Sequence, residues 1–174
     1  MTGLDATAMF LEIAQIDAER RGVDVDYVLG DMRNLPWTER FAVVISWFTS
    51  FGYFDDEQNR IVLHEVRRCL RPGGLFLLDL NHRDGLLPVW RASDLVHGHG
   101  PRGGLMVDER EFDPVTGRSS TVRSVVRDGS TRRFSFFVRL FSFTELRDWL
   151  RHADFATVTG YAGDGDRGVD GAEG

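Results

Sequence analysis

Two aspartates stand directly after short apolar segments that are typical of β-strands. Asp5 ends the segment that begins at Met1, and Asp31 follows the segment Val25 to Gly30. In an open α/β sheet, ligands bind at the carboxyl ends of the strands, and a carboxylate can accept hydrogen bonds from two hydroxyl groups at once. The two aspartates are therefore candidates for ligand binding. Asp5 can equally cap the following helix, and Asp31 can equally form a turn with Gly30.

Aromatic and polar side chains near other strand ends are further candidates. Trp47 and Phe48 close the longest apolar run and could pack on a flat ring, with core packing as the alternative. The ring face of Tyr53 could orient a ligand or face a cation, or the residue could be buried with its hydroxyl satisfied. Asn81 follows another predicted strand and Arg139 lies in a later one, and both side chains could reach a ligand.

Three weaker signals do not indicate a phosphate or metal site. The spacing G-x-G-x-x-G occurs at residues 98–103 and 163–168. A phosphate loop needs a strand before it and a helix after it, and neither stretch has both. Asp94, His97 and His99 lack a third histidine and helical spacing, so we expect no metal.

Composition excludes several classes of protein. The chain has 174 residues, 42% of them apolar, which suits one domain with a buried core. Its net charge of −6 provides no basic field for a nucleic acid. The single cysteine, Cys69, suits a reducing compartment, and no apolar run approaches the length of a membrane span. We therefore expect a cytoplasmic protein that binds neither nucleic acid nor membrane.

Strand and helix patterns alternate in the first half of the chain. Apolar runs at Val25–Gly30, Phe41–Trp47 and Leu75–Leu80 predict strands, the last two buried on both faces as in a parallel sheet. A helix is predicted up to about Arg21. A second opens with the capping-box spacing of Asp55–Gln58 and ends before Pro72-Gly-Gly74. This alternation predicts an α/β fold with a parallel sheet.

The second half has a different pattern. Residues 82–104 are loop-like with one short helix, and turn signals then divide residues 103–141 into three antiparallel strands. Ser142–Glu145 is another capping box, which opens a helix with Leu146, Trp149 and Leu150 inward. Phe155–Tyr161 is predicted as a last strand. Residues 163–174 are mostly small or polar and are predicted to be disordered.

The order of these segments resembles the class I (Rossmann-like) S-adenosylmethionine-dependent methyltransferases. The resemblance covers about residues 2–163, and residues 1–162 are expected to form a partial methyltransferase domain. Ser50-Phe-Gly-Tyr-Phe54 followed by Leu70-Arg-Pro-Gly-Gly-Leu-Phe-Leu-Leu-Asp79 is particularly similar to their bacterial small-molecule branch. Three later stretches resemble that branch too: Phe112–Arg118, Arg139-Leu-Phe-Ser-Phe-Thr-Glu-Leu146 and Ala153–Phe155. It implies transfer of a methyl group from S-adenosylmethionine to a small-molecule amine or hydroxyl group.

The resemblance also assigns roles to the candidate residues. Asp5 and its neighbour Ala6 would bind the ribose, Asp31 and Met32 the adenine, and Trp47 and Phe48 would pack on the adenine or below the sulfonium. Tyr53, Asn81 and Arg139 would contact the substrate. Methyl transfer is an in-line displacement that depends mainly on positioning, so no catalytic residue is assigned.

One family element is missing from these 174 residues. The cofactor turn, an acid followed by Gly-x-Gly-x-Gly, belongs after a first strand that lies at the centre of the sheet, and the sequence contains neither. We therefore expect a truncated product or a misplaced start, with weak or no binding of S-adenosylmethionine. The alternative from another class is a non-catalytic remnant that forms a homodimer through its open sheet edges. A nucleotide-binding oxidoreductase is the least supported interpretation, because it lacks a phosphate loop.

Overall fold

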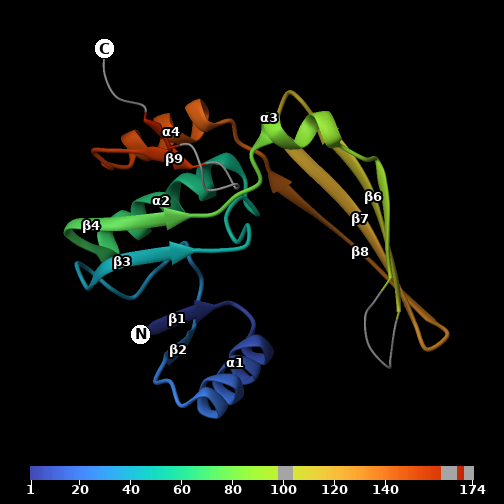
Figure 1. Ribbon diagram of the computed structural model, residues 1–174, viewed down its shortest axis with the longest axis horizontal. Helices are drawn as coiled ribbons and strands as arrows, with labels where there is room; N and C mark the ends of the chain where they lie inside the picture. Colours follow the sequence, from blue (N-terminus) through green and yellow to red (C-terminus); the bar gives the residue numbers. More distant parts are fainter. Residues whose placement is uncertain (98–103, 162–167, 171–174) are drawn as a thin grey trace.

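The protein is described by a computed structural model, in which residues 1–97, 104–161 and 168–170 can be placed. Figure 1 shows two parts: an α/β part with short parallel strands, and an antiparallel sheet that extends away from it. The mixed α/β, Rossmann-like fold class predicted from the sequence is confirmed.

The N-terminal unit consists of β1 (Thr2–Asp5), α1 (Ala8–Arg21) and β2 (Asp26–Leu29). The two strands are parallel and pair in register from Thr2 with Asp26 to Asp5 with Leu29. Gly22 ends α1 in the left-handed conformation, at φ 65°, as is common after a helix. Asp5 and Asp31 consequently lie at the same edge of this pair of strands.

A second parallel pair is formed by β3 (Phe41–Ser46) and β4 (Leu70–Leu78), with α2 (Asp56–Cys69) between them in sequence. Asp55 caps α2 as predicted, because it accepts a hydrogen bond from the Gln58 N–H at 2.8 Å, but the Gln58 side chain accepts from Arg33 instead of closing the capping box. β4 starts earlier than predicted. Pro72 and the two glycines after it lie within β4, where the pairing with β3 shifts register.

One face of this pair forms the hydrophobic core. Val44, Phe76 and Leu78 pack against buried residues of α2 and of α4 (Phe143–His152). Ser142 caps α4 as predicted, by accepting from the Glu145 N–H at 3.3 Å, while the Glu145 carboxylate pairs with Arg139. The predicted inward positions Trp149 and Leu150 are buried.

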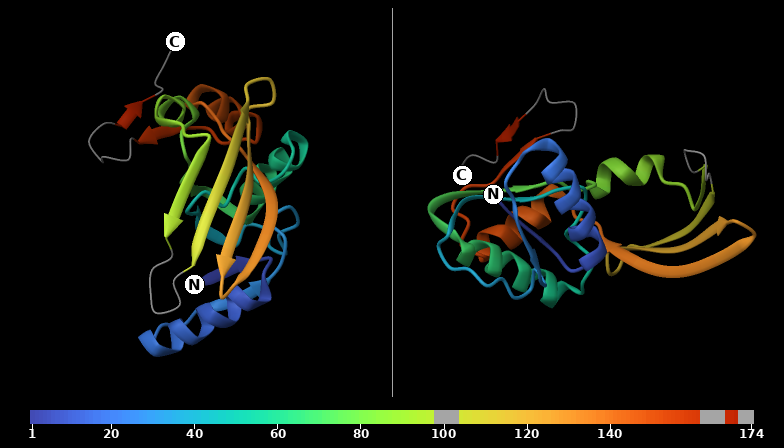
Figure 2. Two further views of the ribbon diagram at one scale, coloured as in Figure 1. Left: turned by 90° about the vertical axis from the view of Figure 1, so that its right-hand side faces the viewer. Right: turned by 90° about the horizontal axis from the view of Figure 1, so that it is seen from below.

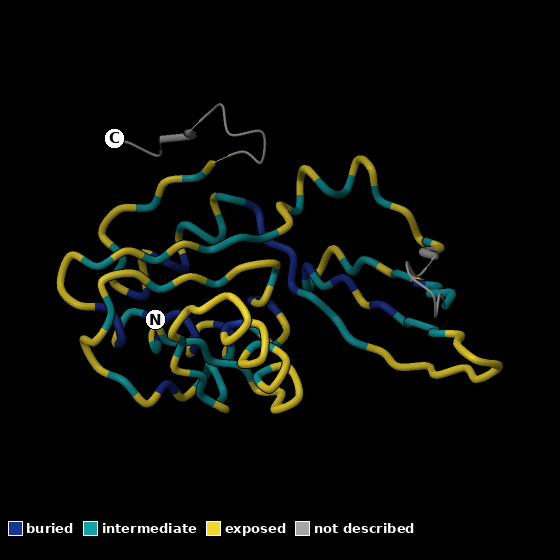
Figure 3. Tube along the Cα trace, turned by 60° about the horizontal axis from the view of Figure 1, so that its bottom comes forward, coloured by how far each residue is buried: buried dark blue, intermediate teal, exposed yellow. Residues whose placement is uncertain are grey.

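The other face of β3 and β4 is exposed, contrary to the prediction that both faces are buried. Val43 pairs with Leu75 and Ile45 with Leu77, and these four side chains are 45–68% exposed. The apolar run does form a strand, but no helix of the described residues covers this face. The helix α1 is also largely exposed along its length (Figure 3).

Among the described residues, β1 pairs only with β2, and β3 pairs only with β4. Both pairs therefore have an unpaired edge, and Figure 1 shows β1 and β3 as neighbours in space without a strand between them. The central strand expected from the resemblance would belong at this position.

The antiparallel sheet has four strands, where three were predicted. They are β5 (Ser93–His97), β6 (Leu105–Asp113), β7 (Arg118–Arg127) and β8 (Ser130–Arg139), in that order across the sheet. β5 lies in the segment predicted to be loop-like, which otherwise contains α3 (Arg83–Leu86) and the 3-10 helix η1 (Leu87–Val89). Figure 2 shows the curved sheet with α3 and η1 at one end of it.

The C-terminal segment contains a short strand, β9 (Thr159–Tyr161), within the predicted range. It pairs with β10 (Gly168–Asp170), so these three residues of the predicted irregular tail are ordered in a strand. The remainder of that tail, like the G-x-G-x-x-G stretch at 98–103, lies outside the described residues.

Candidate functional site

The carboxyl ends of β1 to β4 form the edge at which the predicted cofactor residues lie. At the end of β1, one oxygen of Asp5, Oδ1, accepts a hydrogen bond from the Thr7 N–H at 2.7 Å. Its second oxygen has no hydrogen-bond partner among the described residues. The carboxylate thus supports the start of α1, as the capping interpretation requires, and still has an acceptor for a ligand hydroxyl.

Asp31 is already paired. Its carboxylate accepts from the Arg33 side chain, with Nε 3.0 Å from Oδ1 and 3.1 Å from Oδ2, and from the Arg33 backbone N–H at 2.9 Å. These hydrogen bonds lower the pKa of the Asp31 carboxyl. Arg33 also stacks over Phe54, with its Cζ 4.3 Å from the centroid of the ring. A ligand amino group at this position would share Asp31 with Arg33, and the neighbouring backbone of Met32 is the other predicted contact.

The loop after β3 carries the two predicted aromatic residues. Trp47 is 48% exposed and Phe48 is 82% exposed, so neither ring lies in the core. Phe48 and Thr49 both have positive φ angles, 51° and 55°, which non-glycine residues adopt at a cost. The edge therefore offers aromatic surface that a flat ring could cover.

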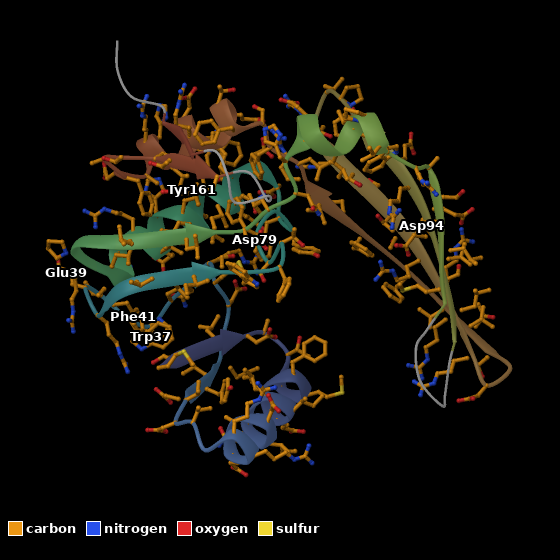
Figure 4. All side chains as sticks on the ribbon, in the orientation of Figure 1. Trp37, Glu39, Phe41, Asp79, Asp94 and Tyr161 are labelled. Atoms are coloured by element: carbon orange, nitrogen blue, oxygen red, sulfur yellow. The ribbon has the colours of Figure 1, made fainter. Side chains whose placement is uncertain are left out.

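Asp79 holds this loop in place. Its Oδ2 accepts from the Phe48 N–H at 3.0 Å, and its carbonyl oxygen accepts from the Thr49 N–H at 3.2 Å. Figure 4 labels Asp79 at the end of β4, on the side that faces the antiparallel sheet. Asp79 was not among the residues predicted from the sequence, although it follows an apolar strand just as Asp5 does.

A cavity of about 520 Å³ lies next to this edge, between the loop, α3 with η1, and the antiparallel sheet. Two of the three predicted substrate residues, Tyr53 and Asn81, line it. Aromatic rings form part of its wall, since Tyr53 lies 6.4 Å from Phe136, centroid to centroid, and Trp90 is a further lining residue. The cavity therefore combines apolar surfaces with polar groups, as small-molecule sites do.

The floor of the cavity is a charged network on one face of the sheet. Asp108 of β6 is opposite Arg123 of β7 in register, and Arg110 lies two residues along on the same face. The Asp108 carboxylate accepts from Nε and Nη2 of Arg123 at 2.6 and 2.7 Å and from Nη2 of Arg110 at 2.8 Å. Hydrogen bonds from Arg123, the largest cause, lower the pKa of Asp108. None of the residues of this network was predicted from the sequence.

Arg139, the third predicted substrate residue, is not among the residues that line the cavity. It is 6% exposed, and its guanidinium binds Asp56 of α2, Glu145 of α4 and the Leu140 carbonyl. Its carbon Cζ lies 4.8 Å from the centre of the Phe141 ring. In this arrangement Arg139 connects β8 to two helices.

Gly117 provides the space that Arg139 occupies. At φ 66° it adopts a conformation that side chains rarely take, and a Cβ atom there would collide with Nη1 of Arg139 and lie 2.7 Å from its Cζ. We expect Gly117→Ala to lower the free energy of unfolding by about 1–3 kcal/mol. Gly129→Ala is the matched control, because Gly129 also has a positive φ, 72°, but nothing lies within 4 Å of its Cβ position.

Urea unfolding followed by circular dichroism measures both variants. The Gly117 variant should lose more stability than the Gly129 variant, whose cost comes from the backbone alone. Equal losses in the two variants would contradict the proposed packing of Arg139 against Gly117.

The part of the chain that can be described shows neither a metal cluster nor a membrane-spanning helix. It contains no group of three or more histidine, cysteine or acidic side chains arranged to hold a metal ion. None of its helices has the length and apolarity needed to cross a membrane.

Comparisons with known proteins agree with this fold. Residues 1–74 match a family described as a methyltransferase domain. The structure is similar to an S-adenosylmethionine-dependent methyltransferase from Clostridium acetobutylicum, with a TM-score of 0.72 over 87% of this chain and 62% of that one, at 20% identity. The chain therefore has the fold of the S-adenosylmethionine-dependent methyltransferases, and its first 74 residues match the sequence of a methyltransferase domain. The predicted family resemblance is thus confirmed.

Two further matches have acceptors in their names. A demethylmenaquinone methyltransferase from Thermotoga maritima is 40% identical over 81 residues, which are 46% of this chain and 33% of the relative. The amino pentose methyltransferase CalS10 from Micromonospora echinaspora has a TM-score of 0.64 at 21% identity, over 96% of this chain and 70% of that one. The matched part of the chain spans about one third of the length of the Thermotoga relative.

Proposed function

We propose that the chain is part of an S-adenosylmethionine-dependent methyltransferase that modifies an amine or hydroxyl group of a small molecule. The observation that carries the proposal is the position of the cavity. Thr49, Tyr53 and Asn81 line it, and the first and last of these follow β3 and β4 at the edge where the predicted cofactor residues lie. An acceptor in the cavity would therefore lie beside the cofactor. The names of the similar proteins support a small-molecule acceptor.

The donor set at the edge fits the adenosine half of the cofactor. Asp5 has an oxygen available for a ribose hydroxyl, Asp31 with the Met32 backbone would bind the adenine, and Trp47 and Phe48 offer ring faces. When bound, S-adenosylmethionine supplies an electrophilic methyl group on a sulfonium. Tyr53 and Asn81 would orient the acceptor toward that methyl group. No side chain is assigned as a base, since an amine acceptor in its neutral form needs none before the displacement.

The 174 residues contain no glycine turn for the methionine half of the cofactor. In such a turn, backbone N–H groups contact the methionine half of the cofactor, and glycine lets the backbone come close to it. Both features would contribute to the free energy of binding. We therefore expect calorimetric titration of this chain with S-adenosylmethionine to give a dissociation constant of about 0.1 mM or weaker, which corresponds to about 5.5 kcal/mol of binding free energy. Low-micromolar affinity would contradict this expectation.

A second candidate function is association with another copy of the chain. It is favoured by the exposed apolar face of β3 and β4 and by the unpaired strand edges, because exposed edges and apolar patches promote association. Sedimentation velocity should then show a sedimentation coefficient that rises with concentration.

The variant Leu75→Gln tests the surface responsible, because Leu75 lies on this face and is 68% exposed. This substitution should make the sedimentation coefficient depend less on protein concentration. Val115→Gln is the control, since Val115 is 91% exposed in the turn between β6 and β7. A monomer at every concentration, or the same response in both variants, would exclude association through this face.

A further inference from the structure

The cavity floor holds two guanidinium groups around one buried carboxylate. The side chain of Asp108 is 1% exposed, whereas those of Arg110 and Arg123 are 25% and 29% exposed. Asp108 thus lies below the two arginines and fixes their positions. A buried acid that orients arginines through short, charge-assisted hydrogen bonds limits the rotamers they can adopt. The two guanidiniums are therefore held in place before any ligand arrives.

Both arginines retain donors for a ligand. Asp108 occupies Nε and Nη2 of Arg123, and Nη1 of Arg123 donates to none of the described residues. Arg110 uses Nη2 for Asp108, and its Nη1 lies 3.7 Å from a carboxylate oxygen of Asp94, which is 42% exposed. Both arginines line the cavity and are partly exposed, so their side chains form part of the surface that a ligand in it would contact.

Two hydroxyl groups and two rings complete this part of the wall. Ser119 and Thr121 lie on β7 on the same face as Arg123, are 7% and 5% exposed, and line the cavity. Neither hydroxyl makes a hydrogen bond to the described residues. Phe136, opposite Thr121 in register, and Tyr53 present rings beside them. The wall thus has polar donors on one strand and apolar ring surface next to it.

The charge of the cavity is opposite in sign to that of the chain. Three arginines and two aspartates line it, while the whole chain carries a net charge of −6. Building on the proposed function, we infer that the acceptor is a ring-bearing small molecule with an anionic group, a carboxylate or a phosphate, that binds Arg123 and Arg110. The guanidinium forks match the oxygens of both kinds of anion. The ring would pack against Tyr53 and Phe136.

Three probes of similar shape test this inference: benzoate, phenyl phosphate and the neutral benzamide. We would titrate each into the chain at constant ionic strength and follow the arginine Nε–H signals by NMR. At least one anion should bind at least about fivefold more tightly than benzamide, because hydrogen bonds between charged groups are stronger than neutral ones. The anion that binds more tightly identifies a carboxylate or a phosphate as the preferred group.

Two substitutions and a control locate the binding. Arg123→Gln should reduce anion affinity at least about fivefold. Arg110→Gln should also weaken it, while Asp108 keeps its two hydrogen bonds to Arg123 and the fold is preserved. Arg133→Gln is the control, since Arg133 binds Glu109 on the opposite face of the sheet and is 65% exposed. Circular dichroism confirms that each variant is folded.

Equal binding of the three probes, or anion binding that neither cavity substitution weakens, would overturn the inference. So would an equal loss in Arg133→Gln. None of the probes contains an adenosine, and Asp5 and Asp31 do not line the cavity. The result is therefore independent of the titration with S-adenosylmethionine, and failure of one can be distinguished from failure of the other.

Discussion

Replacing Asp108 with alanine is expected to lower the free energy of unfolding by about 3–5 kcal/mol, as breaking a buried ion pair does. The side chain of Asp108 is 1% exposed and accepts hydrogen bonds from two arginines on neighbouring positions of the sheet. Removing it leaves two guanidiniums facing each other without an intervening negative charge. Urea unfolding at neutral pH measures the loss.

Asp94→Ala is the matched control for this variant. Asp94 is opposite Asp108 in register on β5, but its side chain is 42% exposed and it lies 3.7 Å from Arg110. Such an exposed ion pair contributes about 0–1 kcal/mol to the free energy of unfolding, so Asp94→Ala should lose no more than that. Similar losses in the two variants would show that Asp108 is not the centre of the network.

The same network implies a dependence of stability on pH. Because the folded protein lowers the pKa of Asp108, the stabilisation is present above the ordinary range for an aspartate and is lost as the pH falls through the depressed pKa. The Asp108 variant should lose less stability than the wild type on acidification. This comparison adds a second readout to the same experiment.

Leu63→Ala is expected to lower the free energy of unfolding by about 2–5 kcal/mol, the range for truncation of a fully buried leucine. Leu63 lies on α2, is 0% exposed, and belongs to the core between α2, α4 and the covered face of β3 and β4. Alanine leaves a cavity that the surrounding side chains fill only in part. Thermal and urea unfolding measure the change.

Ile61→Ala, two residues earlier on the same helix, serves as the comparison. Ile61 is 42% exposed, so its truncation removes less buried surface, and we expect a loss of at most about 1 kcal/mol. If the two truncations had the same effect, the covered face of the sheet would not be the site of the core.

Local sequence patterns predicted the elements that depend on neighbouring residues. The two helix caps were found because each cap and its donor are three residues apart, and Asp55 and Ser142 both accept from the N–H of the third residue after them. The apolar run at Phe41 was correctly predicted as a strand. Its burial was not, because burial depends on which other elements cover the sheet, and Val43 and Ile45 are exposed.

The cavity floor required information that no local pattern contains. Asp108 and Arg123 are 15 residues apart and meet only because the turn between β6 and β7 sets the register. β5 was missed because its five residues follow a loop-like segment and carry polar residues at both ends. Asp79 could have been found, since it follows an apolar strand in the same way as Asp5 and Asp31.

The role of Asp5 at the cofactor edge can be tested by comparing two ligands in calorimetric titrations: S-adenosylmethionine and adenosine. The edge residues would contact only the adenosine half, so both ligands should bind weakly and with similar affinity. In Asp5→Asn, one oxygen remains for the Thr7 N–H, but the second acceptor is lost. Both affinities should then fall by about tenfold, or about 1.4 kcal/mol. Low-micromolar binding of S-adenosylmethionine, or affinities that Asp5→Asn leaves unchanged, would contradict the account.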